Sequence, residues 1–198
     1  SSRNKFQGHN IDQFGLTRHE VVGVIFCIFL FSLIIDLFRL YAETFRIWFF
    51  KQFGYMMRKQ EETQLTGATY IIAGSLVCSL ISLWSEFFAA SAFLSLTLFI
   101  LGDAAAALCG KAFGKIKVGE KTLEGTIGCF VLCLVLSSGI FPQLPSFLVN
   151  WNGDFTWMDM IFFPLGIALL ELFPIRFGRI TLNDNLYVPA VVSLLILI

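Results

Sequence analysis

Residues 87–125 read FFAASAFLSLTLFILGDAAAALCGKAFGKIKVGEKTLEG, which is an apolar run followed by a basic turn. The run over residues 87–108 contains one charged residue, Asp103. As a helix it rises about 1.5 Å per residue, which is enough to cross most of a bilayer core. Four lysines then follow, at positions 111, 115, 117 and 121, and a second apolar run begins at Gly125. The stretch predicts two membrane helices joined by a charged turn.

The same turn carries groups suited to a metal-bound phosphate compound. A carboxylate such as that of Asp103 can hold a divalent cation, while lysines and exposed glycine N–H groups can hold phosphates. Gly110 and Gly114 fit a phosphate cradle, but small residues at this spacing also permit close helix packing in membranes, so both alternatives stay open. A site of this kind beside a membrane helix suggests an enzyme that brings a charged phosphate compound to a lipid-dissolved substrate.

Composition sets the class of the protein. Of the 198 residues, 57% are hydrophobic and 14% are charged, which predicts an integral membrane protein. A formal net charge of zero gives no basis for a nucleic-acid partner. The five cysteines lie in or beside apolar runs, and we interpret them as small buried hydrophobic residues. We expect a polar lead over residues 1–20 and one integral-membrane catalytic domain over residues 21–198; a homo-oligomer stays open.

The apolar runs predict an all-α fold, a bundle of about five or six transmembrane helices. Thr66 is a suitable N-cap for the second helix. The last run is too short for a full crossing at about 20 residues per span. The predicted spans are residues 21–38, 68–84, 87–108, 125–140 and 160–173, and the short last run is 186–198.

Charges and aromatic residues alternate between the first two spans. On a helix, the aromatic residues at three- and four-residue spacings would form an apolar stripe opposite basic side chains. We therefore expect an interfacial amphipathic helix in the membrane surface. The stripe consists of Phe45, Trp48, Phe49 and Phe53, and the basic residues are Arg39, Arg46 and Lys51.

The distribution of Lys and Arg predicts the orientation. If each span crosses once, loops 39–65, 111–122 and 174–186 share one face, and they hold most of the basic residues. The positive-inside rule makes this face cytoplasmic. Asp36, near the end of the first span, is expected to reach this interface as a snorkelling carboxylate. The same count of crossings places several acids at this face together with Lys121. They are Asp36, Glu61, Asp103, Glu124, Glu171 and Asp184.

Acids so close to apolar helices need a compensating partner. On insertion scales a charge at a helix centre costs about 2.5–3.5 kcal/mol, and less near the interface. One such partner is Mg²⁺ with phosphate oxygens, since Mg²⁺ takes oxygen ligands from one or two carboxylates. The alternative is an ion pair that orients helices. The basic candidates for such pairs are Arg39, Arg58 and Lys121.

Four short motifs that contain these acids and glycines follow one another along the chain. They are Arg58-x-x-Glu61-x-x-x-Leu65-Thr66-Gly67-Ala68-Thr69-Tyr70; Gly102-Asp103-Ala104-x-Ala106 with Gly110 and Gly114; Lys121-Thr122-x-Glu124-Gly125; and Glu171 with Asp184-Asn185-Leu186-x-Val188-Pro189. Together they resemble the CTP-dependent lipid kinase family that contains dolichol kinase, phytol kinase and the CTP-dependent diacylglycerol kinases. The resemblance covers residues 36–189.

The resemblance implies a polytopic helical enzyme, related to phosphatidate cytidylyltransferases, that transfers the γ-phosphoryl group of CTP to a lipid alcohol with Mg²⁺. In one respect the chain departs from the pattern. Family members usually open with an Arg-Lys-x-x-His motif, and here only Lys5 and His9, at a different spacing, precede the first span. A missing N-terminal segment would explain the difference.

Taken with the resemblance, the residues suggest roles. We expect Asp103 and Asp184 to hold Mg²⁺, and Glu124 or Glu171 to orient or deprotonate the lipid hydroxyl. Basic side chains would neutralise the triphosphate, and glycine N–H groups would contact its oxygens. The expected nucleotide-binding residues are Arg58, Gly102, Gly110, Lys111, Gly114, Lys115, Lys121, Thr122, Gly125 and Asn185.

The acceptor lipid stays open, because diacylglycerol, a polyprenol or dolichol, and phytol each present one hydroxyl on an apolar body. The sequence of residues 66–70 resembles bacterial members, which favours a bacterial inner membrane; a eukaryotic chain would belong to the endoplasmic reticulum.

Two other functions are compatible with the sequence. One is a cytidylyltransferase that attacks the α-phosphate of CTP, and the other is a small ion-coupled transporter, which would carry its acids near the membrane midplane.

Overall fold

The computed structural model describes residues 17–57, 59–119, 121–153, 155–177 and 180–197. Most of the predicted polar lead therefore lies outside the described residues. The first helix begins at Arg18, before the predicted start at residue 21. The reason is a capping box: Glu20 N–H donates to the Thr17 hydroxyl, and Thr17 N–H donates to the Glu20 carboxylate at 2.6 Å.

The described residues form an all-helical fold, as predicted, with two very short antiparallel strand pairs that close turns between helices. The α-helices are α1 (Arg18–Tyr41), α2 (Glu43–Phe53), α3 (Gly67–Ile81), α4 (Glu86–Phe113), α5 (Leu123–Gly139), α6 (Pro145–Asn150), α7 (Trp157–Leu172) and α8 (Asp184–Leu194). Short 3₁₀ segments cover Gly54–Met56, Lys59–Glu62, Phe141–Gln143 and Leu195–Leu197. The strands are β1 (Lys117–Val118) with β2 (Lys121–Thr122), and β3 (Arg176–Phe177) with β4 (Ile180–Thr181).

Three described helices are long and apolar enough to cross a membrane: α1, α4, and α5 with its 3₁₀ extension to Gln143. They are compatible with an integral membrane protein. The predicted five or six crossings are not confirmed, because α3, α7 and α8 have 15, 16 and 11 residues and a crossing needs about 20. Helix α4 continues past its predicted end at residue 108 to Phe113, since four alanines favour helix and Gly114 is its C-cap.

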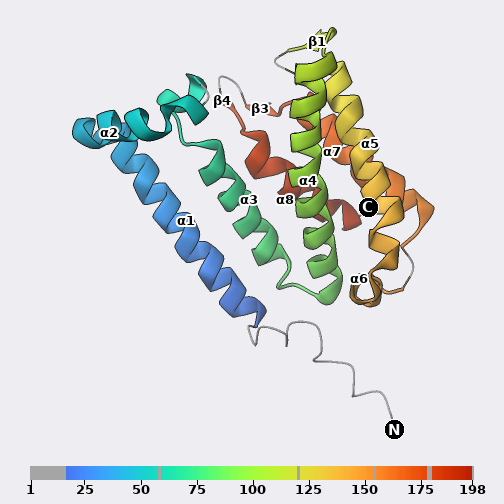
Figure 1. Ribbon diagram of the computed structural model, residues 1–198. Coiled ribbons are helices and arrows are strands. Elements are labelled where there is room, and N and C mark those ends of the chain that lie inside the picture. The colour runs from blue at the N-terminus through green and yellow to red at the C-terminus, as the bar shows by residue number, and fades with distance from the viewer. Residues whose placement is uncertain (1–16, 58, 120, 154, 178–179, 198) are drawn as a thin grey trace.

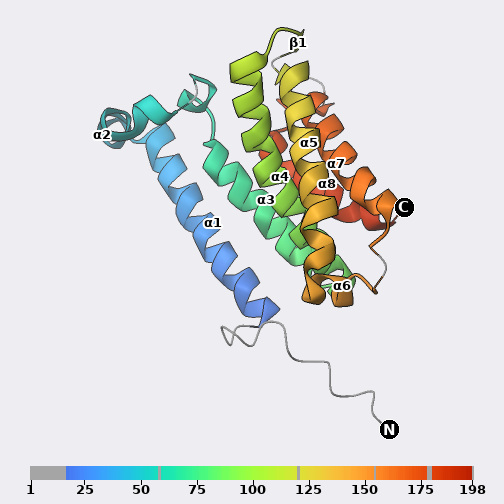
Figure 2. The same cartoon turned by 45° about the vertical axis from the view of Figure 1, so that its right-hand side comes forward.

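The long helices run side by side in alternating directions (Figures 1 and 2). Helix α2 and both strand pairs lie at one end, which we call the charged end, and the start of α1 lies with α6 at the opposite end. Helix α8 enters from the charged end and stops in the middle of the bundle, where it packs on α3 and α4. The three basic loops that the count of crossings assigned to one face thus lie at the same end of the bundle.

Helices α4 and α5 approach closely where glycines face each other. A Cβ atom on Gly125 would lie 2.7 Å from the Ala106 carbonyl oxygen and 3.4 Å from the Gly110 Cα atom. A Cβ atom on Gly110 would lie 2.7 Å from Thr122 Oγ1. Larger side chains would separate the two backbones, so these glycines set the position of the turn that joins α4 to α5.

A buried ion pair fixes α1 to the start of α3. Arg39 Nε donates to Asp36 Oδ1 at 3.1 Å, and both side chains are buried. Asp36 Oδ2 accepts from Thr66 N–H at 2.8 Å and from Thr69 Oγ1 at 2.7 Å. The prediction that Asp36 reaches the surface is therefore wrong, because these donors satisfy its charge inside the bundle.

Arg39 also organises the segment after α2. Its two terminal nitrogens donate to the backbone oxygens of Glu61 and Gln64, and its guanidinium carbon lies 6.0 Å from the centre of the Phe49 ring. The prediction that Arg39 lies on the polar face of the amphipathic helix is wrong, since Arg39 belongs to the end of α1. The aromatic stripe does form on α2. Its ring contacts are Phe45 with Trp48 and Phe49, and Phe53 with Trp48 and Phe49.

Substitution of Gly125 by alanine should weaken the α4–α5 contact. We predict that Gly125→Ala lowers the free energy of unfolding by about 1–3 kcal/mol, because the new methyl group meets backbone oxygen. Thermal unfolding in detergent measures the change. Gly139→Ala, in the last residue of the same helix, has nothing within 4 Å of the new Cβ atom and should be neutral. Equal effects of the two variants would contradict the close contact.

Removal of Arg39 should be among the most damaging single changes. Arg39→Ala leaves the Asp36 charge buried without its counter-ion, so we predict a loss of about 3–5 kcal/mol of stability. Arg46→Ala is the matched control, because Arg46 is exposed and pairs weakly with Glu43 at 3.8 Å. A melting temperature for Arg39→Ala close to that of Arg46→Ala would refute the buried pair.

Candidate functional site

The ammonium group of Lys121 lies between three carboxylates at the charged end. Its Nζ atom donates to Asp184 Oδ2 at 2.7 Å and to Glu171 Oε1 at 3.1 Å, and lies 4.0 Å from Asp103 Oδ1. The three acids belong to α8, α7 and α4, and Lys121 belongs to β2. We call these four residues the Lys121 cluster. Three motifs that are far apart in the sequence thus meet at one point.

The cluster is closed on one side and open on the other. The side chain of Glu171 is 3% exposed, whereas those of Lys121 and Asp103 are 31% and 32% exposed. Glu171 Oε2 is buried and has no hydrogen-bond partner among the described residues. Such an oxygen lowers stability unless a ligand or water donates to it.

The cluster carries more negative than positive groups, since three carboxylates face one ammonium. Burial disfavours the charge on Lys121, but the attraction of Glu171 and Asp184 outweighs it and raises the pKa of the Lys121 ammonium above its usual value. Lys121 therefore stays charged at physiological pH.

Local structure positions these side chains. In the β1–β2 pair Val118 stands opposite Lys121, and the turn uses Gly119 in a left-handed conformation (φ +64°) that glycine adopts without strain. Thr122 caps α5 by accepting from Gly125 N–H at 3.2 Å. Asn183 caps α8 in the same way, which places Asp184 in its first turn, where the helix dipole favours a carboxylate.

Asn185 connects the cluster to the start of α3. Its Nδ2 atom donates to the Gly67 carbonyl oxygen at 3.5 Å, and Gly67 N–H donates to Glu61 Oε1 at 2.8 Å. A Cβ atom on Gly74 would lie 2.5 Å from the Asn185 carbonyl oxygen, so α3 and α8 are in close contact here. Asn185 was expected to bind the nucleotide. In the structure it joins the motif that contains Gly67 to the motif that contains Asp184.

Other predicted residues lie outside the cluster. Glu124 accepts from Ile116 N–H at 3.2 Å and so holds the β1–β2 turn against α5. Lys111 lies in the last turn of α4 and Lys115 lies between α4 and β1, and both are exposed. Arg58 lies outside the described residues.

The predicted glycine cradle differs from what the structure contains. Gly114 N–H donates to the Gly110 carbonyl oxygen at 3.0 Å, and Gly110 itself lies inside α4, so neither N–H is free for a phosphate. Gly125 N–H bonds to the Thr122 cap. A Cβ atom on Gly102 would lie 2.8 Å from the sulfur atom of Cys129 and also from that of Cys133. These contacts favour the packing alternative for the glycines.

The expected magnesium ligands Asp103 and Asp184 are brought together, but with Lys121 between them. Across the described part of the chain, no group of three or more His, Cys, Asp or Glu side chains could hold a metal ion as it stands. Three carboxylates, which are the ligand type that a hard cation prefers, converge here, but the Lys121 ammonium lies between them. In this arrangement the ion-pair alternative is realised, with Lys121 as the cation.

Sequence reasoning missed the buried pair of Asp36 and Arg39. The signal was present, because a carboxylate and a guanidinium three residues apart at the end of an apolar run lie on the same helix face.

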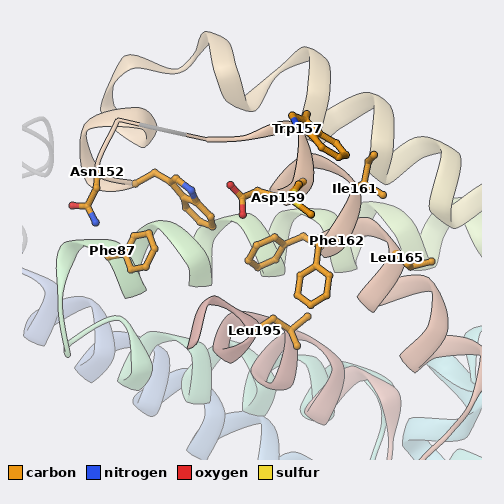
Figure 3. A pocket seen from close by; sticks show the side chains of 11 residues that line it. Phe87, Asn152, Trp157, Asp159, Ile161, Phe162, Leu165 and Leu195 are labelled. Atoms are coloured by element: carbon orange, nitrogen blue, oxygen red, sulfur yellow. The ribbon is translucent and has the colours of Figure 1, made fainter. Parts of the chain in front are cut away.

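A cavity of about 680 Å³ lies at the opposite end of the bundle (Figure 3). Its walls are mainly aromatic and aliphatic side chains of α7 and the preceding loop, together with Phe87 and Leu195. Asp159, an acid on its wall, accepts at Oδ2 from the N–H and hydroxyl of Thr156. None of the predicted site residues that the structure describes lines this cavity.

Chemically, the Lys121 cluster offers a charged cation for phosphate, two partly exposed carboxylates for a metal ion, and a buried carboxylate oxygen as a proton acceptor. It lies at one end of the apolar bundle. No protein-family model, curated protein or solved structure matches this chain.

Proposed function

We propose that this protein transfers the γ-phosphoryl group of CTP to the hydroxyl group of a membrane lipid alcohol. The observation that carries the proposal is the meeting of Lys121 with Asp103, Glu171 and Asp184. These four residues come from three of the four groups that resemble the CTP-dependent lipid kinases. Their convergence at one end of the bundle supports a single active site there.

We place the protein in the membrane as follows. Helices α1, α3, α4, α5 and α7 cross, and α8 enters only part of the bilayer. Helix α2 lies in the membrane surface with its aromatic stripe toward the lipid. The charged end faces the cytoplasm because its loops carry most of the Lys and Arg. The membrane is a bacterial inner membrane, or that of the endoplasmic reticulum in a eukaryote.

Phosphoryl transfer depends mainly on positioning and on neutralising charge. Lys121 binds phosphate oxygens, and the exposed Lys111 and Lys115 add positive charge along the path into the site. Asp103 and Asp184 are the residues that would hold Mg²⁺, which when bound neutralises phosphate charge. Arg58 is assigned to the triphosphate by the resemblance.

Glu171 accepts the proton of the lipid hydroxyl, because its Oε2 atom is buried and without a partner. The hydroxyl oxygen then forms a bond to the γ-phosphorus, the bond from that phosphorus to the β–γ bridging oxygen breaks, and CDP leaves. Glu124, which already accepts from Ile116 N–H, holds the turn that carries Lys121 and is a positioning residue. Diacylglycerol, a polyprenol or dolichol, and phytol remain the candidate alcohols.

A cytidylyltransferase is the second candidate, since the same cluster could bind CTP and direct attack at the α-phosphorus with release of pyrophosphate. The transporter alternative has less support, because the acids gather at the charged end with a lysine and not at the middle of the bundle.

The proposed reaction predicts the fate of a label. Purified protein in detergent with Mg²⁺ and γ-labelled CTP should label one lipid of a panel of diacylglycerol, undecaprenol, dolichol and phytol, and labelled ATP should not replace CTP. The product separates the two candidates, because α-labelled CTP would mark the lipid only in nucleotidyl transfer. Phosphatidate, the acceptor of the second candidate, is tested beside this panel, and no label in any of the five lipids from either compound would exclude both.

Asp103→Asn should reduce turnover by about 10²-fold or more, because it removes charge from the proposed metal site. The variant should stay folded, since Asp103 is partly exposed and lies 4.0 Å from Lys121. Initial rates of label transfer and the melting temperature are measured together. Glu43→Gln, an exposed acid on α2, is the control and should keep full activity. Unchanged turnover in Asp103→Asn would remove Asp103 from the site.

A further inference from the structure

The cavity at the opposite end of the bundle from the Lys121 cluster combines aromatic rings with a carboxylate (Figure 3). We propose that it binds an apolar cation, which is an ammonium group attached to a hydrocarbon body. The ammonium lies beside Asp159, and the body lies among the apolar side chains. The inference does not rest on the proposed phosphoryl transfer, because no residue of the Lys121 cluster lines this cavity.

The size and lining of the cavity fit a mainly apolar ligand. Sites for small molecules measure about 300–1,000 Å³ and are lined by apolar side chains, with a few polar groups that orient the ligand. This cavity measures about 680 Å³, and apart from its tryptophans the polar side chains on its described wall are those of Asn152 and Asp159. The body of the ligand is therefore hydrocarbon, and these two side chains select its polar group.

Asp159 favours a cation as that polar group. Its Oδ2 atom accepts from the N–H and the hydroxyl of Thr156, which fixes the side chain in the first turn of α7. A carboxylate has about four acceptor sites, so two hydrogen bonds leave capacity for a ligand. Figure 3 shows the carboxylate pointing toward the side of the cavity that holds Asn152 and Phe87.

No basic side chain competes for Asp159 within the described part of the chain. The described wall contains no Lys, Arg or His, and none of the ion pairs among the described residues includes Asp159. An acid without a counter-ion in a mainly apolar wall attracts a ligand cation and repels a ligand anion, because the low local dielectric strengthens both interactions.

The aromatic rings are the second feature that selects a cation. Trp151 and Phe163 are buried, and their ring centres lie 5.5 Å apart. Trp157 and Phe162 are exposed, so they border the opening. The faces of such rings carry negative partial charge, and groups of them bind quaternary ammonium ligands in other proteins. Rings and carboxylate together favour an ammonium whose surface is apolar.

The test is equilibrium dialysis of radiolabelled hexyltrimethylammonium against the purified protein in a maltoside detergent, with protein-free micelles as the blank. Asp159→Asn should raise the dissociation constant about tenfold, because it removes the charge but keeps an oxygen that can cap α7. Glu43→Gln removes an exposed acid on α2, away from the cavity, and should leave the constant unchanged. Equal constants for the two variants would overturn the inference.

A second pair of variants tests the rings, and it decides the question if Asp159→Asn lowers the melting temperature. Phe162→Leu keeps an apolar wall but removes a ring, so binding should weaken about threefold. Phe26→Leu, which replaces a similarly exposed ring on α1, should bind like the wild type. Equal constants for these two variants would refute the site.

Competition tests the charge of the ligand and separates its two sources. Hexanol, which has the same chain without a charge, should displace the labelled cation about tenfold less well than the unlabelled cation does. Displacement by phosphatidylcholine would assign the site to a lipid headgroup, whereas displacement by benzyltrimethylammonium alone would assign it to a soluble cation. Phosphatidylglycerol has no ammonium group, so equal displacement by hexanol or by phosphatidylglycerol would contradict the inference. Label transfer from CTP is unaffected by any of these outcomes, because the cavity and the Lys121 cluster lie at opposite ends of the bundle.

Discussion

An ammonium group held between carboxylates from three helices determines the geometry of the charged end. Helices α4, α7 and α8 each bring one acid to Lys121, whose positive charge offsets the repulsion among the three carboxylates. The attraction therefore does two things. It stabilises the approach of three helices that also share the hydrogen bonds of Ser91 to the Ser193 carbonyl oxygen and of Tyr187 to the Leu170 carbonyl oxygen, and it gathers charged groups at one end of the bundle.

The buried pair of Asp36 and Arg39 is a second centre of charge, and it is joined to the first. Arg39 holds the backbone of the segment before α3, Glu61 accepts from Gly67 N–H, and Asn185 donates to the Gly67 carbonyl oxygen beside Asp184. Polar contacts thus continue from the end of α1 to the Lys121 cluster. This continuity explains why the motif around residues 61–70, which contributes no acid to the cluster, lies next to it.

Local signals made much of the fold predictable. Thr66 caps α3 as predicted, and the apolar runs and their parity correctly placed the basic loops at one end. Tertiary choices could not be predicted. Several basic residues of the sequence could have paired with the acids. In the structure the residue that does so is Lys121, which lies on β2. It also could not decide between a phosphate cradle and helix packing at Gly110, because that depends on Thr122 and Gly125 from the next helix.

The central claim is that Lys121 and Asp184 attract each other directly across two separate elements. A double-mutant cycle in detergent, with Lys121→Met, Asp184→Asn and the double variant compared with the wild type by thermal unfolding, measures that attraction. The account predicts a coupling energy of about 1–3 kcal/mol, since the two groups are hydrogen-bonded at 2.7 Å and partly buried. Additive effects of the two single changes would contradict it.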